Sequence, residues 1–338
     1  MEELKNNKNS IYDLKRFNNI ISRLDIILEN VLKNIPIGYK NSVEEIRLRI
    51  QKPLMIDVRG KDYFITENGQ LTKDSMRGYI IKKENIKKSF ERLCEYSIYA
   101  VEDEIRNGFI TIKGGHRIGI SGKVIYKNKC ISTIKDISSI NIRIAREKIG
   151  VSKNIIGYLV DKDSIYNTLI ISPPQCGKTT LLRDIIRSIS NGISEYGIRG
   201  LKVAVIDERS EIGGIYQGIP QNDLGVRTDI LDRVNKYDGT LMMLRSLSPH
   251  VIATDELGDK LDIDAINNSL KAGVKILTTI HGANIEDIKN KPNISLIMKE
   301  KIFQRIIILD NSKGVGTVKD IVDGKTNKSL INNRGGII

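Results

Sequence analysis

Cysteine and histidine are scarce in this 338-residue sequence, which contains three of each. The cysteines are Cys94, Cys130 and Cys176, and the histidines are His116, His250 and His281. The cysteines lie far apart without C-x-x-C spacing, and the histidines do not cluster with them as metal ligands do. This pattern predicts a reduced compartment and no structural zinc.

Long apolar runs are missing as well. No stretch has the roughly 20 apolar residues that a membrane-spanning helix needs, and residues 1–10 are too polar for a signal peptide. Hydrophobic residues make up 40% of the chain and charged residues 28%, which is typical of a folded globular protein. We therefore expect a chain that is made and kept in the cytoplasm, and its length suggests two domains.

Aromatic residues are few, at 5%, and acidic residues are outnumbered by basic ones. The 54 Lys and Arg against 41 Asp and Glu give a formal charge of +13. Nucleic acid, an acidic membrane surface or an acidic partner would each suit that charge. The basic residues are scattered along the chain without a dense block or interleaved aromatics, so charge alone does not choose a partner and nucleic acid is not favoured.

The first half, residues 1–150, mixes helical and strand patterns. Apolar residues at three- and four-residue steps predict one amphipathic helix from Ile11 that is ended by Pro36; they are Leu14, Phe17, Ile21, Leu24, Leu28 and Val31. Alternating apolar residues predict strands, and a helical pattern and a hairpin lie among them; the segments are 46–50, 54–58, 86–93, 109–120 and 140–144. This half is predicted to be a small α+β domain for assembly or partner docking.

The second half, residues 151–338, alternates short apolar runs with helical patterns. The runs are 168–171, 203–206, 251–254, 276–279 and 306–309. Such runs suit strands that are buried on both faces of a parallel sheet. We therefore expect a three-layer α/β domain whose ligands lie at the carboxyl ends of the strands. From about residue 323 the chain becomes a polar, glycine-containing tail.

A phosphate-binding loop follows the first of these runs and precedes a helical pattern. Its residues are Ser172, Pro173, Pro174, Gln175, Cys176, Gly177, Lys178, Thr179 and Thr180. Such a loop needs backbone N–H groups at a helix N-terminus, a lysine for the β- and γ-phosphates, and a hydroxyl for Mg²⁺. Lys178 and Thr179 supply the last two, although Ser172 stands where the usual motif has its first glycine. The segment predicts a site for ATP and Mg²⁺.

Two other apolar runs each end in a pair of acids, Asp207-Glu208 and Asp255-Glu256. Two adjacent carboxylates repel each other unless a cation or substrate offsets them, which indicates a magnesium site. We predict that Asp255 holds Mg²⁺ through water and that Glu256 orients and polarises the attacking water. Asp207 and Glu208 are then expected near the γ-phosphate. For either pair alone, an exposed acidic turn that caps the next helix is the plainer alternative.

A histidine, His281, follows the apolar run 276–279 and is expected at the same edge of the sheet. A lone histidine more often packs or forms a hydrogen bond than takes part in catalysis. The position beside the predicted phosphate loop favours a sensor of the γ-phosphate.

A GTPase is the first rival interpretation. The segment 235–238 spells the guanine-reading N-K-x-D, and 255–258 spells D-x-x-G, but a GTPase carries the two in the opposite order. The segment 229–234 is rich in charge and predicts a helix or loop, whereas N-K-x-D should follow an apolar strand. We interpret both matches as coincidences and prefer ATP to GTP.

The ordered set of a phosphate loop, an acidic box, a Walker B motif and a histidine box resembles the ATPases that drive type II and type IV secretion and pilus retraction. Within that superfamily the chain is most similar to the stage III sporulation protein AA family. The similar segments are 45–49, 108–122, 173–174, 177–184, 207–212, 244–249 and 279–282. The likeness implies a RecA-like P-loop NTPase domain after the smaller α+β domain. Asp255 stands where many secretion ATPases have glycine, which strengthens the magnesium prediction.

This resemblance implies a homohexameric motor, peripherally associated with the cytoplasmic face of a membrane on the mother-cell side. It implies a role in powering or assembling the export-like channel between mother cell and forespore, with the membrane component stage III sporulation protein AB as partner. It also implies that an arginine of a neighbouring subunit reaches the γ-phosphate. The candidates are Arg117, Arg143 and Arg146, with Arg227 and Arg245 as alternatives in the ATPase domain. For each, a surface arginine without a catalytic role is the alternative.

Two further functions stay open at this point. A RecA-like or helicase-type motor would act on nucleic acid, with the +13 charge as its footprint. Single-stranded DNA would then stimulate hydrolysis in a salt-sensitive way. A regulatory nucleotide-binding module would turn ATP over slowly in every context.

Overall fold

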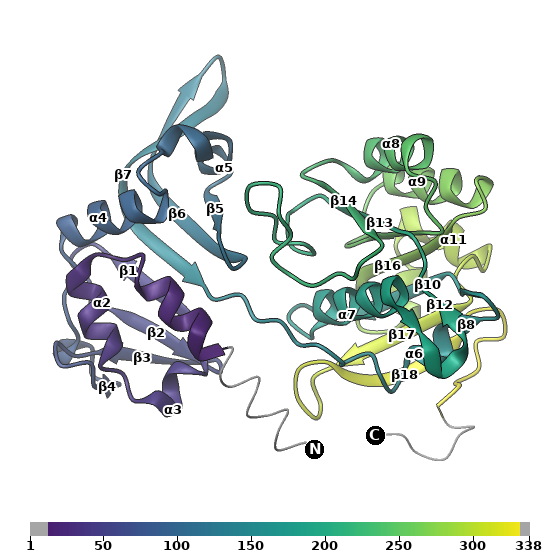
Figure 1. Ribbon diagram of the computed structural model, residues 1–338, viewed down its shortest axis with the longest axis horizontal. Helices are drawn as coiled ribbons and strands as arrows, with labels where there is room; N and C mark the ends of the chain where they lie inside the picture. Colours follow the sequence, from purple (N-terminus) through teal and green to yellow (C-terminus); the bar gives the residue numbers. More distant parts are fainter. Residues whose placement is uncertain (1–12, 332–338) are drawn as a thin grey trace. The chain divides into compact units, whose positions relative to one another are not determined.

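The computed structural model describes residues 13–331, apart from the side chains of Ala100 and Pro292 (Figure 1). The chain forms two compact units. The first contains the described residues up to Arg146 together with the segment Tyr216–Gln221. The second contains Glu147–Ile215 and the residues from Asn222 onwards. The assignment of Tyr216–Gln221 to the first unit is a feature that no sequence pattern predicts.

An antiparallel sheet with the strand order β4-β3-β2-β1-β7-β6-β5 is the centre of the first unit. Its strands are β1 (Val43–Arg49), β2 (Met55–Val58), β3 (Lys61–Ile65), β4 (Leu71–Thr72), β5 (Phe109–Ile112), β6 (His116–Lys127) and β7 (Cys130–Arg143). The helical elements are residues 13–21, α2 (Ile26–Lys33), α3 (Ile37–Lys40), α4 (Lys83–Leu93) and α5 (Glu102–Arg106), with the 3-10 turns η1 (Ser75–Arg77) and η2 (Ile98–Val101). Apolar residues of the strands and helices share one core, so this unit has the predicted α+β character.

The prediction of one helix up to Pro36 was wrong. The helix over residues 13–21 ends before a turn, and α2 begins only at Ile26. The turn is held by the buried Asp25, whose carboxylate accepts a hydrogen bond from Asn85 Nδ2 at 2.5 Å and whose N–H donates to Ser89 Oγ at 2.9 Å. Because these partners lie on α4, the break is imposed by tertiary contacts that helical periodicity does not contain.

The predicted hairpin over 109–120 is confirmed as β5 and β6, joined through Gly114 and Gly115, which both have positive φ. The strand predicted around 140–144 is only the end of β7, which begins at Cys130. β6 and β7 form a long ribbon whose turn, Asn128-Lys129, has positive φ at both residues, as a tight hairpin turn requires.

A mostly parallel sheet with the order β14-β13-β15-β16-β10-β17-β18 is the centre of the second unit. Its strands are β10 (Thr168–Ser172), β13 (Val203–Asp207), β14 (Thr228–Asp232), β15 (Val251–Thr254), β16 (Lys275–His281), β17 (Arg305–Asp310) and β18 (Thr317–Asp323). All five predicted strands are confirmed. β10, β13 and β15 are buried along their whole length, which is why their sequences are continuous apolar runs.

Helices cover both faces of this sheet. They are α6 (Ile156–Leu159), α7 (Lys178–Asn191), α8 (Lys236–Ser246), α9 (Lys260–Lys271), α10 (Ile285–Lys289) and α11 (Pro292–Lys299). Successive residues of β10 face opposite cores: Ile170 packs with residues of α7, whereas Leu169 and Ile171 pack with residues of α9, α10 and α11. The three-layer α/β prediction is therefore correct, and it brings the carboxyl ends of β10, β13, β15 and β16 to one edge.

Two strands of the seven-stranded sheet were not predicted. The charged segment 229–234, expected to be a helix or loop, contains most of β14, which pairs in parallel with β13. β14 is the edge strand and only half-buried, so it carries aspartates that a central strand excludes. The other is β18, which pairs antiparallel with β17.

The chain beyond β18 turns back onto that strand. Asp323 donates its backbone N–H to Lys328 O at 3.0 Å, and Leu330 donates to Ile321 O at 2.7 Å. The predicted polar tail is therefore hydrogen-bonded to β18 as far as Leu330, and its last residues lie outside the described part. Among the helices of residues 13–331, none is long and apolar enough to cross a membrane.

Candidate nucleotide-binding site

The phosphate loop connects the end of β10 to the start of α7. Gly177 is the N-cap of α7 with a φ of 85°, and no side chain caps the helix. The first N–H groups of α7 therefore keep the capacity to bind an anion, which the helix dipole also attracts. Ser172, the departure from the usual motif, is the last residue of β10, where the extended backbone does not require glycine.

Glycine is needed at position 177 for a second reason. A Cβ atom there would lie 3.2 Å from both Gly316 N and Gly316 Cα. Gly316 belongs to the loop between β17 and β18 and donates its N–H to Cys176 O at 3.2 Å. This loop thus packs against the phosphate loop and fixes its backbone.

Lys178, Glu256 and His281 meet at the carboxyl edge of the sheet. The Lys178 ammonium group contacts Glu256 Oε1 and lies 2.7 Å from His281 Nε2, which is itself 2.6 Å from the same carboxylate oxygen. The lysine comes from α7, the glutamate from the turn after β15 and the histidine from the end of β16. The structure therefore brings three predicted site residues together, as the strand-end rule requires.

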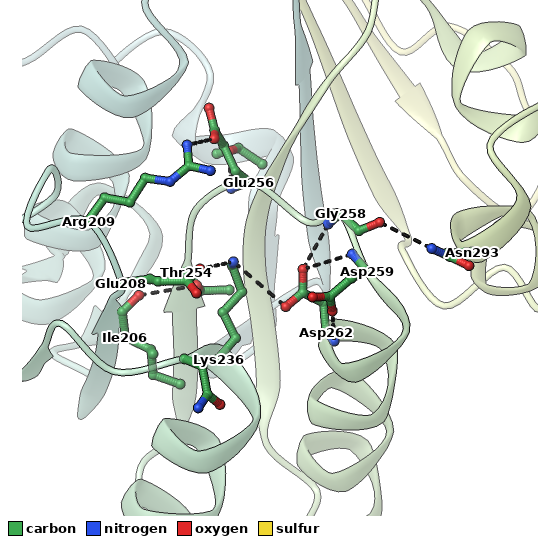
Figure 2. Close-up of polar contacts among 12 residues, drawn as sticks. Ile206, Glu208, Arg209, Lys236, Thr254, Glu256, Gly258, Asp259, Asp262 and Asn293 are labelled. Carbon is green, nitrogen blue, oxygen red and sulfur yellow. Dashed lines mark hydrogen bonds and ion pairs between the residues drawn. The ribbon is translucent and has the colours of Figure 1, made fainter. Parts of the chain in front are cut away.

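Glu256 is held on both oxygens. Its second oxygen contacts the guanidinium group of Arg209, an ion pair that Figure 2 shows. Burial favours the protonated form of Glu256, but the hydrogen bond from Lys178 and the charges around it outweigh burial and lower its pKa to about 2. Glu256 is therefore a carboxylate at neutral pH, with a φ of 43° that places it in a sharp turn.

Asp255, directly before Glu256, has a contrasting environment. Its side chain is buried, and its Oδ2 atom has no hydrogen-bond partner among residues 13–331. Burial and neighbouring carboxylates, chiefly Asp207, raise the pKa of Asp255 to about 7. A buried carboxylate with an unused oxygen fits a cation or a cation-bound water.

Thr179 and Asp255 are the predicted ligands of a phosphate-bound Mg²⁺. Thr179 lies in the first turn of α7 and is half-buried. Within residues 13–331, no three His, Cys, Asp or Glu side chains gather as a metal-binding group. Mg²⁺ that is bound with phosphates needs only one or two protein groups, so Thr179 and Asp255 fit that donor set.

The two acids at the end of β13 are both held by groups of the protein. The two oxygens of Asp207 accept hydrogen bonds from the backbone N–H groups of the next turn, Glu211 at 2.8 Å, Ile212 at 3.0 Å and Gly213 at 2.7 Å. Asp207 is fully buried, so its visible role is to fix this turn. Glu208 forms an ion pair with Lys236 at 2.5 Å.

The N-K-x-D segment is part of a helix N-terminus. Asn235 is the N-cap of α8, and its side chain accepts a hydrogen bond from Asp238 N at 2.9 Å. Lys236 is buried beside the acidic strand ends. These positions are used inside the protein, which agrees with the interpretation of the motif as a coincidence.

The three arginine candidates of the first unit have different partners. The Arg117 guanidinium lies 3.8 Å from the centre of the Phe109 ring. Arg143 pairs with Glu45 at 3.0 Å while 61% of its side chain is exposed. Arg146 donates hydrogen bonds to the carbonyl oxygens of Asn41, which precedes β1, and of Val43, its first residue. Arg143 is thus the most accessible of the three to solvent.

Two important residues were not predicted. Arg209 lies two positions beyond Asp207 and holds Glu256. Lys236 was set aside with the N-K-x-D match. The signal for Arg209 was available, because it follows an acidic strand end at the edge where Glu256 was expected.

The parallel sheet, the phosphate loop and the acidic strand ends define a RecA-like P-loop protein. The Legionella pneumophila ATPase DotB shares this fold, with 16% identity and a TM-score of 0.51 over 79% of this chain and 72% of DotB. The pilus retraction motor PilT with bound ADP shares it with 15% identity and a TM-score of 0.50 over 79% of this chain and 74% of PilT. At these identities the likeness shows the fold.

The chain belongs to the family described as sporulation stage III, protein AA, whose model matches residues 14–329. Stage III sporulation protein AA of Bacillus subtilis (strain 168) is 40% identical over 306 residues, which are 90% of this chain and 95% of that protein. The family predicted from the motifs is confirmed, and the two solved structures confirm the predicted fold.

Proposed function

We propose that this chain binds ATP with Mg²⁺ at the carboxyl edge of its parallel sheet and hydrolyses it. The observation that carries the proposal is the convergence of Lys178, Glu256 and His281 from three separate elements. The open N-terminus of α7 and the unused oxygen of Asp255 support it. The fold shared with an ATPase and with a pilus retraction motor supports it further.

The phosphates would be held by the loop and the first turn of α7, residues 172–180, through backbone N–H groups and the helix dipole. Lys178 would donate to the β- and γ-phosphate oxygens. Mg²⁺, held by Thr179 and, through water, by Asp255, would neutralise charge that develops on the phosphates.

Glu256 would orient and polarise the attacking water. Its carboxylate is bound by Lys178 and Arg209 in the structure, and a base with a pKa of about 2 is weak. When Lys178 donates to phosphate oxygens instead, one carboxylate oxygen is released, and the pKa of Glu256 rises. His281 contacts both groups and would sense that exchange. Glu208 has a secondary place, because Lys236 holds it.

Hydrolysis would serve the export-like channel between mother cell and forespore, to power or assemble it. Family membership supports this role. We propose a homohexamer, peripheral to the membrane on the mother-cell side, with stage III sporulation protein AB as its membrane partner. An arginine supplied by a neighbouring subunit would reach the γ-phosphate, and Arg143 is the first choice because most of its side chain is exposed.

The proposed activity is tested by phosphate release from ATP with the purified chain, in Mg²⁺ and in EDTA. We expect Mg²⁺-dependent turnover that Lys178→Ala abolishes while the fold stays intact, because Lys178 stabilises phosphate charge and adds little to the core. Hydrolysis by Lys178→Ala at the wild-type rate would refute the phosphate-loop assignment. A large, salt-sensitive stimulation by single-stranded DNA would favour a nucleic-acid motor instead.

The shared site is tested by mixing two inactive variants under conditions that support assembly. Neither Lys178→Ala nor Arg143→Ala should hydrolyse ATP alone. A mixture should regain part of the activity, because some interfaces then combine an intact lysine with an intact arginine. If no mixture of Lys178→Ala with a variant of any of the five candidate arginines regained activity, although subunit exchange was demonstrated, the shared site would have to be abandoned.

A further inference from the structure

Lys236 is the feature of the second unit that the proposed reaction does not use. It is the first residue of α8, and its side chain is only 7% exposed. Its ammonium group lies 2.5 Å from Glu208 Oε2, at the end of β13, and 3.7 Å from Asp262 Oδ1, on α9 (Figure 2). A buried lysine is stable only when carboxylates offset its charge, and here the lysine joins the end of β13 to α9.

Asp262 connects this lysine to the turn that carries Glu256. One oxygen of Asp262 faces Lys236. The other accepts hydrogen bonds from the backbone N–H groups of Gly258 at 2.8 Å and Asp259 at 3.3 Å. Asp259 is the N-cap of α9, and its Oδ1 atom accepts a hydrogen bond from the backbone N–H of Asp262 at 3.0 Å. Figure 2 shows the resulting chain of contacts from Glu208 through Lys236 and Asp262 to Gly258. Gly258 is two residues from Glu256.

The space around the Lys236 ammonium group is too small for a hydrated cation to replace it. The cavity lined by Lys236, Asp262, Thr254 and their neighbours has a volume of about 10 Å³, at the lower limit for one water molecule. Burial would lower the pKa of Lys236, but the hydrogen bond to Glu208 and the charges of nearby carboxylates raise it, so the side chain stays charged. Without that charge, Glu208 and Asp262 would face each other, and the buried Asp255, with no cation between them.

We propose that Lys236 is a positioning residue for ATP hydrolysis, which fixes the turn of Glu256 by holding Asp262 and Glu208 together. The inference rests on the proposed function, because its effect on rate requires Glu256 to act on water. It assigns the N-K-x-D lysine to the geometry of the catalytic edge and gives it no part in recognising a base. A small displacement of Glu256 is enough to slow the reaction, since misplacement by about 1 Å can cost on the order of 100-fold.

The test compares Lys236→Met, which has an unbranched side chain one atom shorter and without charge, with Lys236→Arg, which keeps the charge. Lys275→Met is the matched control, because Lys275 forms an ion pair with Asp161 at 3.7 Å at the start of β16, away from the strand ends that carry the site. We expect Lys236→Met to lower kcat by roughly 10- to 100-fold with little change in KM for ATP. Lys236→Arg should recover part of the rate, and Lys275→Met should match the wild type.

A second readout does not depend on hydrolysis. Hydrogen exchange of the segment 256–262, followed by mass spectrometry, should show a loss of protection at Gly258 and Asp259 in Lys236→Met and none in Lys275→Met. If the wild type did not hydrolyse ATP, the proposed function would fail, and exchange would still decide whether Lys236 fixes the turn. Wild-type kcat together with unchanged exchange in Lys236→Met would overturn the inference.

Thermal denaturation checks that Lys236→Met folds. If it does not, Asp262→Asn decides the question, because asparagine keeps an oxygen for the backbone N–H groups and removes the charge that faces Lys236. We expect this variant to lose protection in the same segment and to lose rate in the same range as Lys236→Met. An Asp262→Asn variant with wild-type rate and exchange would overturn the inference as well.

Discussion

The strands β13 and β15 are neighbours in the sheet, and each ends at two acids, but the two pairs have different surroundings. The Asp207 carboxylate accepts hydrogen bonds from three backbone N–H groups, and Glu208 forms an ion pair with Lys236. Asp255 keeps a buried oxygen without a hydrogen-bond partner among residues 13–331, and Glu256 contacts Lys178 and Arg209, of which Lys178 would turn to the phosphates in the proposed reaction. The same sequence pattern therefore builds a hydrogen-bonded turn at the end of β13 and the proposed catalytic edge at the end of β15.

The largest stability effect is expected at the end of β13. Asp207→Asn replaces one accepting oxygen by an NH₂ group that faces backbone donors, so it should lower the free energy of unfolding by about 3 kcal/mol. Urea denaturation of the variant beside Asp229→Asn, an exposed aspartate of β14, measures this. Equal stability of the two variants would contradict the assigned difference between the two strand ends, because Asp207 would then not hold the turn.

At the end of β15, Asp255→Asn should stabilise the protein at pH 8 by on the order of 2 kcal/mol. The pKa of Asp255 is raised to about 7, so the folded state binds the proton more tightly than the unfolded state. Stability from this group is complete below pH 4 and is lost as the pH rises to 7. Denaturation at pH 5 and pH 8 should show a smaller difference for Asp255→Asn than for the wild type. An unchanged difference would contradict the assigned environment.

A smaller effect is expected for Glu208→Gln. Since Lys236 stays paired with Asp262 in this variant, turnover should fall less than about tenfold, or less than about 1.4 kcal/mol in activation free energy. Steady-state phosphate release measures it. A loss as complete as that of Lys178→Ala would transfer the catalytic role from β15 to β13.

The smallest effect is expected for Arg209→Ala. Its side chain is 54% exposed, and exposed ion pairs contribute about 1 kcal/mol or less. Denaturation at low and high salt should show a loss within that range that shrinks as salt rises. A loss above 2 kcal/mol at high salt would mean that Arg209 anchors the turn of Glu256 and does more than balance its charge.

The sequence was sufficient where one rule determines position. The five central strands were predictable because burial on both faces leaves an apolar run, and the meeting of Lys178, Glu256 and His281 followed from the shared carboxyl edge. The interruption of the helix before Ile26 and the contacts of Asp207 and Lys236 were not predictable. They depend on contacts such as Asp25 with Asn85 and Lys236 with Asp262, which join distant segments and leave no periodic signal.

The prediction for the edge strand β14 was wrong for a related reason. An edge strand has one neighbour and keeps contact with water, so it tolerates Asp229 and Asp232 and loses the apolar pattern that identifies a strand. The acidic pairs show the same limit at the site. Position at the edge could be predicted, but the division of work between the pairs depends on backbone N–H groups and cations from other segments.

A single-turnover experiment with Glu256→Gln tests the central claim most directly. The variant is mixed with a limiting amount of ATP and Mg²⁺, and bound ATP and ADP are measured over time beside the wild type and Glu208→Gln. Glutamine keeps the size and hydrogen bonding of Glu256, so ATP should bind with near wild-type affinity and stay uncleaved, while Glu208→Gln forms ADP. Cleavage by Glu256→Gln at the wild-type rate, with Glu208→Gln inactive, would contradict the account.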